Sequence, residues 1–251
     1  MINIAKSHQR KIREKISNNP PLSLFPDYPV TLDISKAEIK EVSYETAKRV
    51  ILEYEWLGTM GLTQYHYGIY FDGHCAGVVC YGYFNAMSRS GYSHPYEPYV
   101  GNHFAELGIQ LSRGACVHWA HPHSASKLIS KSLKKIKALG YKYAVAFSDP
   151  EAGEVGTVYQ ASNWHYLGFG TRVHYDLHYK SGGLYMNNRD IAKKMKISGK
   201  ANINNYIKDK PHLRIVEIKP KARYIYLLGN KKQNKEMMSV LKSKIKPYIK
   251  R

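Results

Sequence analysis

The sequence predicts an α/β fold in which helices flank a mixed central sheet, followed by a basic α+β appendage. Three observations lead to this fold class. An apolar run over 143–147 precedes a helical pattern, which is typical of a strand followed by a helix. Earlier, an amphipathic helical stretch precedes two strand-like runs joined by Asp72-Gly73, a hairpin turn signal. The net charge of +19 is concentrated at one end, because residues 180–251 hold 20 Lys and Arg against 4 Asp and Glu.

We expect three parts in this chain: a basic N-terminal arm over residues 1–29, a catalytic domain over 30–180 and a basic appendage over 181–251. A chain of 251 residues is long enough to bury the core of one domain that carries an appendage. The concentrated positive charge favours a surface that binds a polyanion such as nucleic acid. A basic tail that is merely solvated is the alternative.

The cysteines and the hydropathy pattern point to a reducing compartment. Cys75, Cys80 and Cys116 follow no metal-binding spacing, so buried free thiols are the simplest interpretation. The amino terminus has no apolar core of a signal peptide, and no window approaches 18 apolar residues. We therefore expect a cytoplasmic protein with no membrane partner.

From the N-terminus, the basic arm is followed by a strand over Val30–Ile34 and a helix that Ser43 caps. Apolar residues recur at i, i+3, i+4 and i+7 from Ala47, which predicts an amphipathic helix. Strands over Tyr65–Phe71 and His74–Tyr81 then form the predicted hairpin.

A long irregular stretch over residues 82–103 is rich in aromatic side chains. Such a stretch in a compact domain is usually functional or disordered. Tyr92, Tyr96 and Tyr99 are candidates for stacking on a nucleic-acid base. A surface loop that packs on itself is the alternative.

A central strand is expected over Phe104–Val117, and it would carry Glu106 and Arg113. The next helix begins near Ser124 and has apolar residues on one side and lysines over the rest. The free N–H groups and the positive end of a helix start can bind an anion. The residues assigned to this site are Ser124, Ala125, Ser126 and Lys127.

The stretch over 141–169 organises the predicted site. Its strand ends at Asp149, and a loop with two glycines leads to Thr157, the expected N-cap of the next helix. This helix is expected to end at Gly168, before a second strand over 171–179. Asp149 then lies at the carboxyl end of a strand and Tyr159 in the first helical turn. Both should face the crevice in which open α/β sheets bind ligands.

Beyond residue 180, the sequence predicts a short helix over Arg189–Met195, a strand pair over Leu213–Ile218 and Tyr224–Leu228, and a terminal helix. The basic side chains of this part are expected to contact phosphates and position a duplex. The residues assigned to this contact are Arg189, Lys193, Lys194, Lys196, Lys219, Lys221, Arg223, Lys231 and Lys232.

Four short strings resemble the signature of the Mom family, phage proteins that modify adenine in DNA on a GNAT-type acyltransferase fold. These strings are SDP at 148–150, GTVYQA at 156–161, NW at 163–164 and YLG at 166–168. The resemblance implies a GNAT-like sheet, a phage- or prophage-encoded protein in the host cytoplasm, and carbamoylmethylation of the adenine N6 amine that evades restriction. It also assigns functional positions to Asp149, Tyr159, Ser124 and Arg113.

In GNAT enzymes, a tyrosine near the strand-end crevice is the usual general acid, and a carboxylate there can orient or deprotonate an incoming amine. Tyr159 and Asp149 fit these roles, although a core aromatic and a turn-forming aspartate are the structural alternatives. Glu106 is the candidate general base, with a structural pair to Arg113 as its alternative.

The resemblance leaves the donor and the metal open. The glycine-rich run that holds the pyrophosphate of coenzyme A in GNAT enzymes is missing before Ser124, so the donor is either acetyl-CoA or an activated glycine such as glycyl-tRNA. The family has been linked to iron, for which His66 with Glu55 or Glu106 offers imidazole and carboxylate ligands. A structural histidine is the alternative.

Three functions are therefore compared. The first is an enzyme that modifies adenine in double-stranded DNA, with the base flipped into the crevice. The second is a GNAT-like acyltransferase that acts on tRNA or another amine. The third is a non-catalytic DNA-binding accessory protein. Restriction resistance of plasmid DNA separates the first function from the other two.

Overall fold

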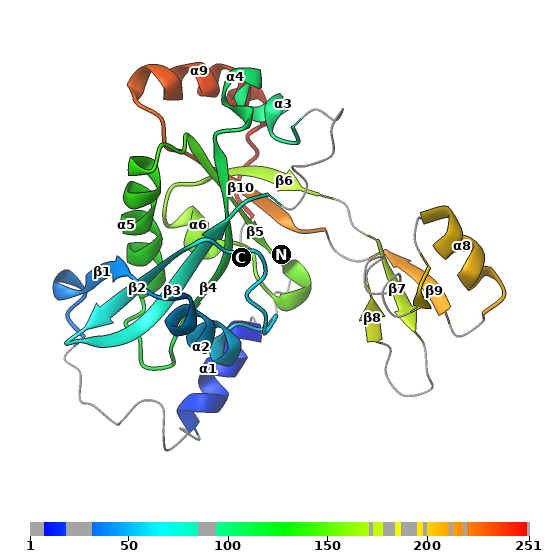
Figure 1. Cartoon of the computed structure of the whole chain (residues 1–251), viewed down its shortest axis with the longest axis horizontal. Helices are drawn as coiled ribbons and strands as arrows, with labels where there is room; N and C mark the ends of the chain where they lie inside the picture. Colours follow the sequence, from blue (N-terminus) through cyan, green and yellow to red (C-terminus); the bar gives the residue numbers. More distant parts are fainter. Residues whose placement is uncertain are drawn as a thin grey trace. The chain divides into compact units, whose positions relative to one another are not determined.

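The computed structural model describes residues 8–18, 32–84, 94–170, 173–177, 184–186, 195–197, 200–210, 213–217 and 220–249. The chain forms two compact units: residues 1–168 together with 222–251, and residues 169–221 (Figure 1). Within the described residues, no helix has the length and apolar character needed to cross a membrane.

The first unit is built on a seven-stranded sheet with the strand order β1-β2-β3-β4-β5-β10-β6. Neighbouring strands pair antiparallel at β1–β2, β2–β3, β3–β4 and β5–β10, whereas β4 and β5 run parallel. The strands are β1 (Glu38–Glu41), β2 (Tyr65–Phe71), β3 (His74–Gly82), β4 (Gly108–Cys116), β5 (Tyr143–Ser148), β6 (His165–Phe169) and β10 (Ala222–Leu227). The predicted α/β class with a mixed central sheet flanked by helices is confirmed.

Helices cover both faces of this sheet, which explains why nearly all of β3 is buried (Figure 1). The Tyr81 hydroxyl bonds to Ser132 of α5 at 2.8 Å, so the next side chain along the strand, Cys80, points to the other face, where α2 packs. The helical segments of the first unit are α1 (His8–Asn18), η1 (Ile34–Lys36), α2 (Tyr44–Tyr54), α3 (Glu97–Val100), α4 (Asn102–Ala105), α5 (Ser124–Ala138), η2 (Pro150–Ala152), α6 (Thr157–Gln160), α9 (Lys231–Leu241) and η3 (Lys242–Lys244).

The α2 helix forms where the sequence predicts it. The Ser43 hydroxyl accepts the Thr46 backbone N–H at 3.2 Å and caps the helix. The apolar stripe that begins at Ala47 is fully buried, as the helical periodicity indicates. The hairpin also forms as predicted, with Asp72 and Gly73 in its turn at positive φ.

The strands β4 and β5 separate toward their carboxyl ends. Their parallel pairing extends from Gly108 and Tyr143 only to Leu111 and Ala146. Beyond this point β4 remains paired with β3, through a register shift opposite Cys80, while β5 remains paired with β10. Polar side chains from both strands lie at this edge of the sheet, where the sequence predicts the crevice, and we call it the crevice edge.

Within its described residues, the second unit contains a three-stranded sheet of order β8-β7-β9 and the helix α8. Its elements are β7 (Val173–Leu177), β8 (Leu184–Met186), β9 (Leu213–Glu217) and α8 (Lys200–Lys208). Ile203, Ile207 and Leu213 form its small apolar core. This unit is an insertion, because the chain returns to the first unit at Ala222.

The division of the chain therefore differs from the sequence-based one. Residues 222–251, which we had assigned to the appendage, contribute β10 and α9 to the first unit. The expected pairing of Leu213–Ile218 with Tyr224–Leu228 is wrong, because β9 pairs with β7 and β10 pairs with β5. The buried residues Tyr224 and Ile225 explain the placement, since each β10 face packs against a different part of the core.

Two further expectations around the crevice are corrected. The loop over residues 149–156, which we call the crevice loop, leads to a helix of a single turn, α6. The YLG string at 166–168 lies in strand β6 rather than at a helix end. A short apolar run fits a strand or a buried helix equally well. Likewise, the strand expected from Phe104 begins only at Gly108, because α4 and a turn precede it.

Candidate functional site

Asp149 lies at the carboxyl end of β5, where the sequence analysis placed it. Its side chain is almost fully buried, with 3% exposed. The Asp149 carbonyl accepts the N–H groups of Ala152 and Glu154, both at 3.0 Å. These bonds fold the chain into a tight turn, and within it the charge of the Asp149 carboxylate acts on the Glu154 carboxylate.

Glu154 is a site residue that the sequence analysis missed. Burial, together with the negative charges of Glu55 and Asp149, raises the pKa of Glu154 to about 7, although hydrogen bonds from the Asp149 backbone and the Trp56 side chain act in the opposite direction. A carboxylate with this pKa exchanges protons near neutral pH. The available signal was an acidic residue in the glycine-containing loop between a strand end and a helix.

Glu55 reaches this carboxylate group from the loop that follows α2. Its side chain is 8% exposed and accepts the Leu57 backbone N–H at 3.0 Å. Arg113, on the separated part of β4, holds the same loop through bonds to the Thr59 carbonyl and hydroxyl at 2.5 and 3.2 Å. Arg113 therefore fixes the α2 loop against β4 at the crevice edge.

Tyr159 lies in α6, on the far side of the crevice loop. Its ring packs against Tyr224 and Trp164, with ring centroids 5.2 and 5.3 Å away. Burial raises the pKa of the Tyr159 phenol well above its usual value, and the charges of Glu154 and Glu55 act in the same direction. The phenol therefore remains protonated at neutral pH, close to the carboxylates.

The position of α6 depends on Gly156. This residue precedes the helix at φ 70°, a left-handed conformation that glycine adopts readily. A Cβ atom there would meet the Tyr224 ring at 2.4 Å. The Tyr224 hydroxyl donates to the Val155 carbonyl at 2.7 Å, so a side chain of β10 anchors the crevice loop.

Ser124 begins α5, at the same edge of the sheet as Asp149. Its side chain is fully buried, and no hydrogen-bond partner of its hydroxyl is found within the described part of the chain. The nearby Lys127 is not aimed at a ligand, because its ammonium group binds the carbonyls of Ile34 and Ser35. The Ser126 hydroxyl donates to the His123 carbonyl at 3.1 Å. Of the four predicted anion-site residues, Ser124 best fits the role, while Ala125 offers its helix-start backbone alone.

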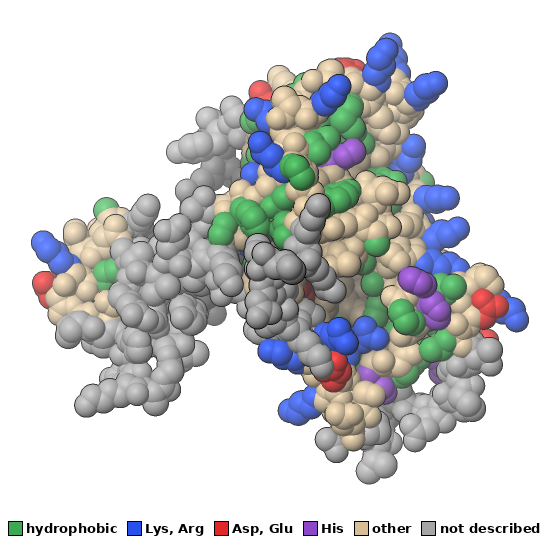
Figure 2. Space-filling model, turned by 180° about the vertical axis from the view of Figure 1, so that it is seen from behind, with side chains coloured by type: hydrophobic (Ala, Val, Ile, Leu, Met, Phe, Trp, Pro, Cys, Tyr) green, Lys and Arg blue, Asp and Glu red, His purple; other side chains and the backbone are tan. Residues whose placement is uncertain are grey.

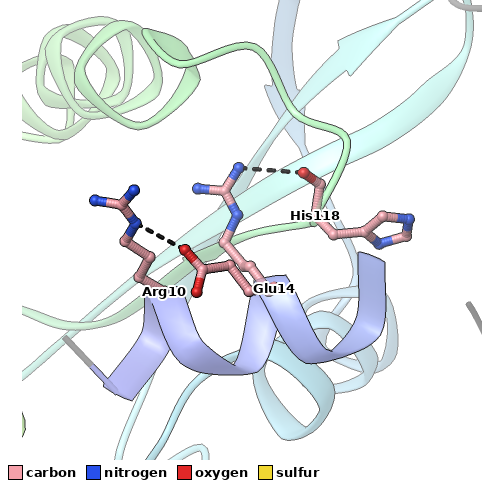
Figure 3. A network of polar contacts seen from close by, with 4 residues as sticks. Arg10, Glu14 and His118 are labelled. Atoms are coloured by element: carbon pink, nitrogen blue, oxygen red, sulfur yellow. Dashed lines mark hydrogen bonds and ion pairs between the residues drawn. The ribbon is translucent and has the colours of Figure 1, made fainter. Parts of the chain in front are cut away.

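The N-terminal helix α1 lies against the loop between β4 and α5. The Gln9 side-chain amide donates to the Gly114 carbonyl at 2.6 Å. Arg13 of the same helix donates to the His118 carbonyl at 3.4 Å, and Figure 3 shows His118 beside α1. The Val117 N–H donates to the Ala76 carbonyl and therefore faces β3. Backbone groups of successive residues point to alternate sides of a strand, so the Gly114 carbonyl points away from β3, toward the side from which β5 has separated. Thus α1 covers a β4 group that β5 no longer pairs with.

Several predicted residues lie away from this cluster. Glu106 is exposed in the turn before β4, and therefore at the opposite edge of the sheet from Asp149, because β4 and β5 are parallel. Tyr96 is 7% exposed and packs against Phe84 and Tyr143, so it does not offer a free face for base stacking. Tyr99 packs on Tyr96 and lies under the Arg223 guanidinium at 5.6 Å. Tyr92 lies outside the described residues.

The proposed metal ligands do not form a metal centre. His66 Nε2 lies 3.0 Å from the Thr63 hydroxyl, and burial lowers the pKa of this histidine. His66 lies opposite Cys80 in the β2–β3 pair, and the charge of Glu55 also acts on Cys80. Among the described residues, no group of three or more His, Cys, Asp and Glu side chains could hold a metal ion. Imidazole and carboxylate are present, but the ligand set that iron requires is not assembled from them.

The predicted phosphate contacts fall into different parts of the chain. Arg189, Lys193, Lys194 and Lys219 lie outside the described residues. Lys196 and Lys221 belong to the second unit, whereas Arg223, Lys231 and Lys232 belong to the first. Lys196, Lys231 and Lys232 are exposed, so their charges are available to a partner.

The model of the Mom protein family matches residues 36–250. No curated protein matches the chain. An N-acetyltransferase from Staphylococcus aureus Mu50 is similar in structure, with a TM-score of 0.43 and 14% identity, over 77% of this chain and 99% of that one.

Two further solved structures are similar to the chain. An IAA acetyltransferase from Bacillus cereus has a TM-score of 0.40 and 9% identity, over 76% of this chain and 99% of its own. A Bacillus subtilis acetyltransferase in complex with CoA has a TM-score of 0.38 and 10% identity, over 76% of this chain and 97% of its own.

Proposed function

Because the chain belongs to the Mom protein family, we propose that it is a transferase that attaches an acyl-derived group, carbamoylmethyl or glycyl, to the N6 amine of adenine in DNA. The observation that carries this proposal is the grouping of Asp149, Glu154 and Tyr159 where β4 and β5 separate. Acyl transfer to an amine requires a group that accepts a proton and a group that donates one.

The residues divide this work by their environments. Asp149, held at the strand end, orients the amine of a flipped adenine. Glu154, with a pKa of about 7, accepts the proton that the amine loses when it attacks. Tyr159 stays protonated, so it can donate to the leaving group of the donor. Arg113 acts indirectly, because it fixes the loop that carries Glu55 and Trp56.

An activated glycine such as glycyl-tRNA is the preferred donor, because it balances the chemistry of a carbamoylmethyl product. The adenine amine first takes the glycyl group and releases the carrier. The glycyl nitrogen then attacks C6 through a five-membered ring, and the bond from C6 to the original amine breaks. The original nitrogen thereby becomes the amide, and no oxidant is needed. Acetyl-CoA, the alternative donor, gives an acetamide with its carbonyl on the nitrogen.

Nucleoside mass spectrometry of plasmid DNA from expressing cells tests this function. With isotope-labelled glycine in the medium, the wild-type chain should give a modified adenine whose mass contains the label, and Asp149→Asn should give unmodified adenine. A modified adenine without label rules out the glycine donor and leaves acetyl-CoA. Unmodified adenine from the wild-type chain, produced as folded protein, rejects the DNA modification itself and leaves an acyltransferase for another amine or an accessory protein.

A further inference from the structure

The edge of the main sheet opposite the crevice is bordered by lysines. The α5 helix runs from the crevice edge back to the start of β5. Strand β10 ends beside the start of β5, and α9 begins shortly after it. The Lys137 ammonium group donates to the Gly229 carbonyl at 3.0 Å and joins the two helices. The exposed lysines here, which we call the lysine ridge, are Lys131, Lys134, Lys135, Lys137, Lys231, Lys232 and Lys235.

The ridge carries almost no compensating negative charge. The α5 helix has no acidic residue, and Glu236 is the one acidic residue of α9. None of the ion pairs found within the described residues involves a ridge lysine. Figure 2 shows Lys and Arg side chains gathered along the margin of the first unit where α5 and α9 lie.

This arrangement opposes helix stability. Lys131 and Lys135 are four residues apart on α5, as are Lys231 and Lys235 on α9, and like charges at this spacing repel. Lys231 and Lys232 also lie in the first turn of α9, where the helix dipole disfavours positive charge. The Asn230 and Gln233 capping box secures that helix start nevertheless. A polyanion that binds across both helices removes this repulsion.

We propose that the lysine ridge is a docking surface for the phosphate backbone of duplex DNA. The inference rests on the proposed function, which it deepens by separating the place that holds DNA from the place that reacts. With 15 residues, α5 spans about 22 Å, which corresponds to about six base pairs of duplex. A stiff duplex along α5 contacts the ridge at one end and brings a base toward Ser124 and the crevice at the other.

Fluorescence anisotropy with a duplex of about 20 base pairs, over a series of salt concentrations, tests the ridge. The variant K131Q/K134Q/K135Q keeps the helix propensity of α5 but removes three charges. We expect its Kd to rise about tenfold near 0.1 M salt and its salt slope to fall by about two to three. A second variant, K231Q/K232Q/K235Q, should act in the same direction, and circular dichroism verifies that both fold.

The matched control is K11Q/K36Q/K40Q, which removes three exposed lysines from α1, η1 and β1. Its Kd should remain within about twofold of the wild-type value. Equal weakening in the ridge and control variants overturns the proposal, because the effect is then one of net charge alone. Loss of binding to an RNA hairpin with DNA binding intact overturns it too. A ridge that binds DNA in a chain that leaves adenine unmodified contradicts the proposed function and leaves the docking surface standing.

Discussion

The two edges of the main sheet hold opposite charges in opposite environments. At the crevice edge, the carboxylates of Glu55 and Asp149 are almost fully buried and raise the pKa of Glu154. At the other edge, the ridge lysines are exposed and lie along two helices. Buried charges interact strongly because little water screens them, whereas exposed charges are screened and act mainly on a partner that displaces the surrounding ions. The same α5 helix thus connects an edge suited to chemistry with an edge suited to docking.

Removing the carboxylate of Asp149 should give the largest effect. The Asp149→Asn variant keeps the backbone carbonyl that accepts the Ala152 and Glu154 N–H groups, so the turn is preserved. We expect product formation to fall about 10³-fold while the Kd for DNA is unchanged. The rate and the Kd for DNA, measured on one preparation, check this. A parallel loss of DNA binding would show that Asp149 also holds the DNA, and would contradict the separation of the two edges.

Tyr159→Phe removes the phenolic proton and retains the ring contacts with Trp164 and Tyr224. The expected result is a rate about 10²-fold lower, with thermal stability nearly unchanged, because the variant loses a proton donor but little packing. Single-turnover rates with saturating donor and DNA provide the measurement. A wild-type rate in this variant would show that Tyr159 packs in the core and does not donate a proton in the reaction.

Glu154→Gln tests whether burial at the crevice edge sets a proton-transfer group. The wild-type rate should rise with pH through about 7 as Glu154 ionises, and the variant should lack this limb. Because the folded pKa is raised from 4.5 to about 7, the unfolded chain loses its proton first, so this group's contribution to stability is lost as pH rises between these values.

The stability of the same variant has a predicted sign. Glu154→Gln removes the repulsion between buried carboxylates, so it should be more stable than the wild-type chain at pH 8, by about 1–3 kcal/mol, and gain less at pH 5. Thermal melts at both pH values measure the difference. A variant that is less stable at pH 8 would show that the hydrogen bonds to Glu154 outweigh the repulsion.

The smallest expected effect concerns the cover over β4. Gln9→Ala removes the bond to the Gly114 carbonyl and should lower the free energy of unfolding by about 1 kcal/mol. Urea denaturation measures this, with Lys11→Ala, an exposed residue of the same helix, as the control. Because Ala favours a helix at least as well as Gln or Lys, helix propensity cannot cause the loss. An equal loss in Lys11→Ala, or no loss in Gln9→Ala, would show that the β4 contact does not stabilise the protein.

The parts of the molecule that were predictable from the sequence are those with local signals. The Ser43 cap, the Asp72-Gly73 turn and the strand end at Asp149 each depend on neighbours along the chain, and each forms as predicted. The insertion of β10 beside β5 depends on partners distant in sequence, so periodicity placed it in the appendage instead.

The site residues show the same limit. Glu106 was assigned to a strand because the apolar pattern extends past it, whereas a short helix and turn leave it exposed. Glu154 carried no motif, and its importance arises only when the loop folds it against Asp149 and the α2 loop. Burial and electrostatic coupling are properties of the folded chain, so the spacing of residues in the sequence does not predict them.

Single-turnover modification of duplex DNA at rising DNA concentration tests most directly whether the crevice edge carries the chemistry and the lysine ridge binds the DNA. The account predicts that K131Q/K134Q/K135Q reaches the wild-type rate once DNA is saturating, and that Asp149→Asn stays slow at every concentration. A ridge variant that remains slow at saturation, or an Asp149→Asn enzyme that excess DNA rescues, would contradict it.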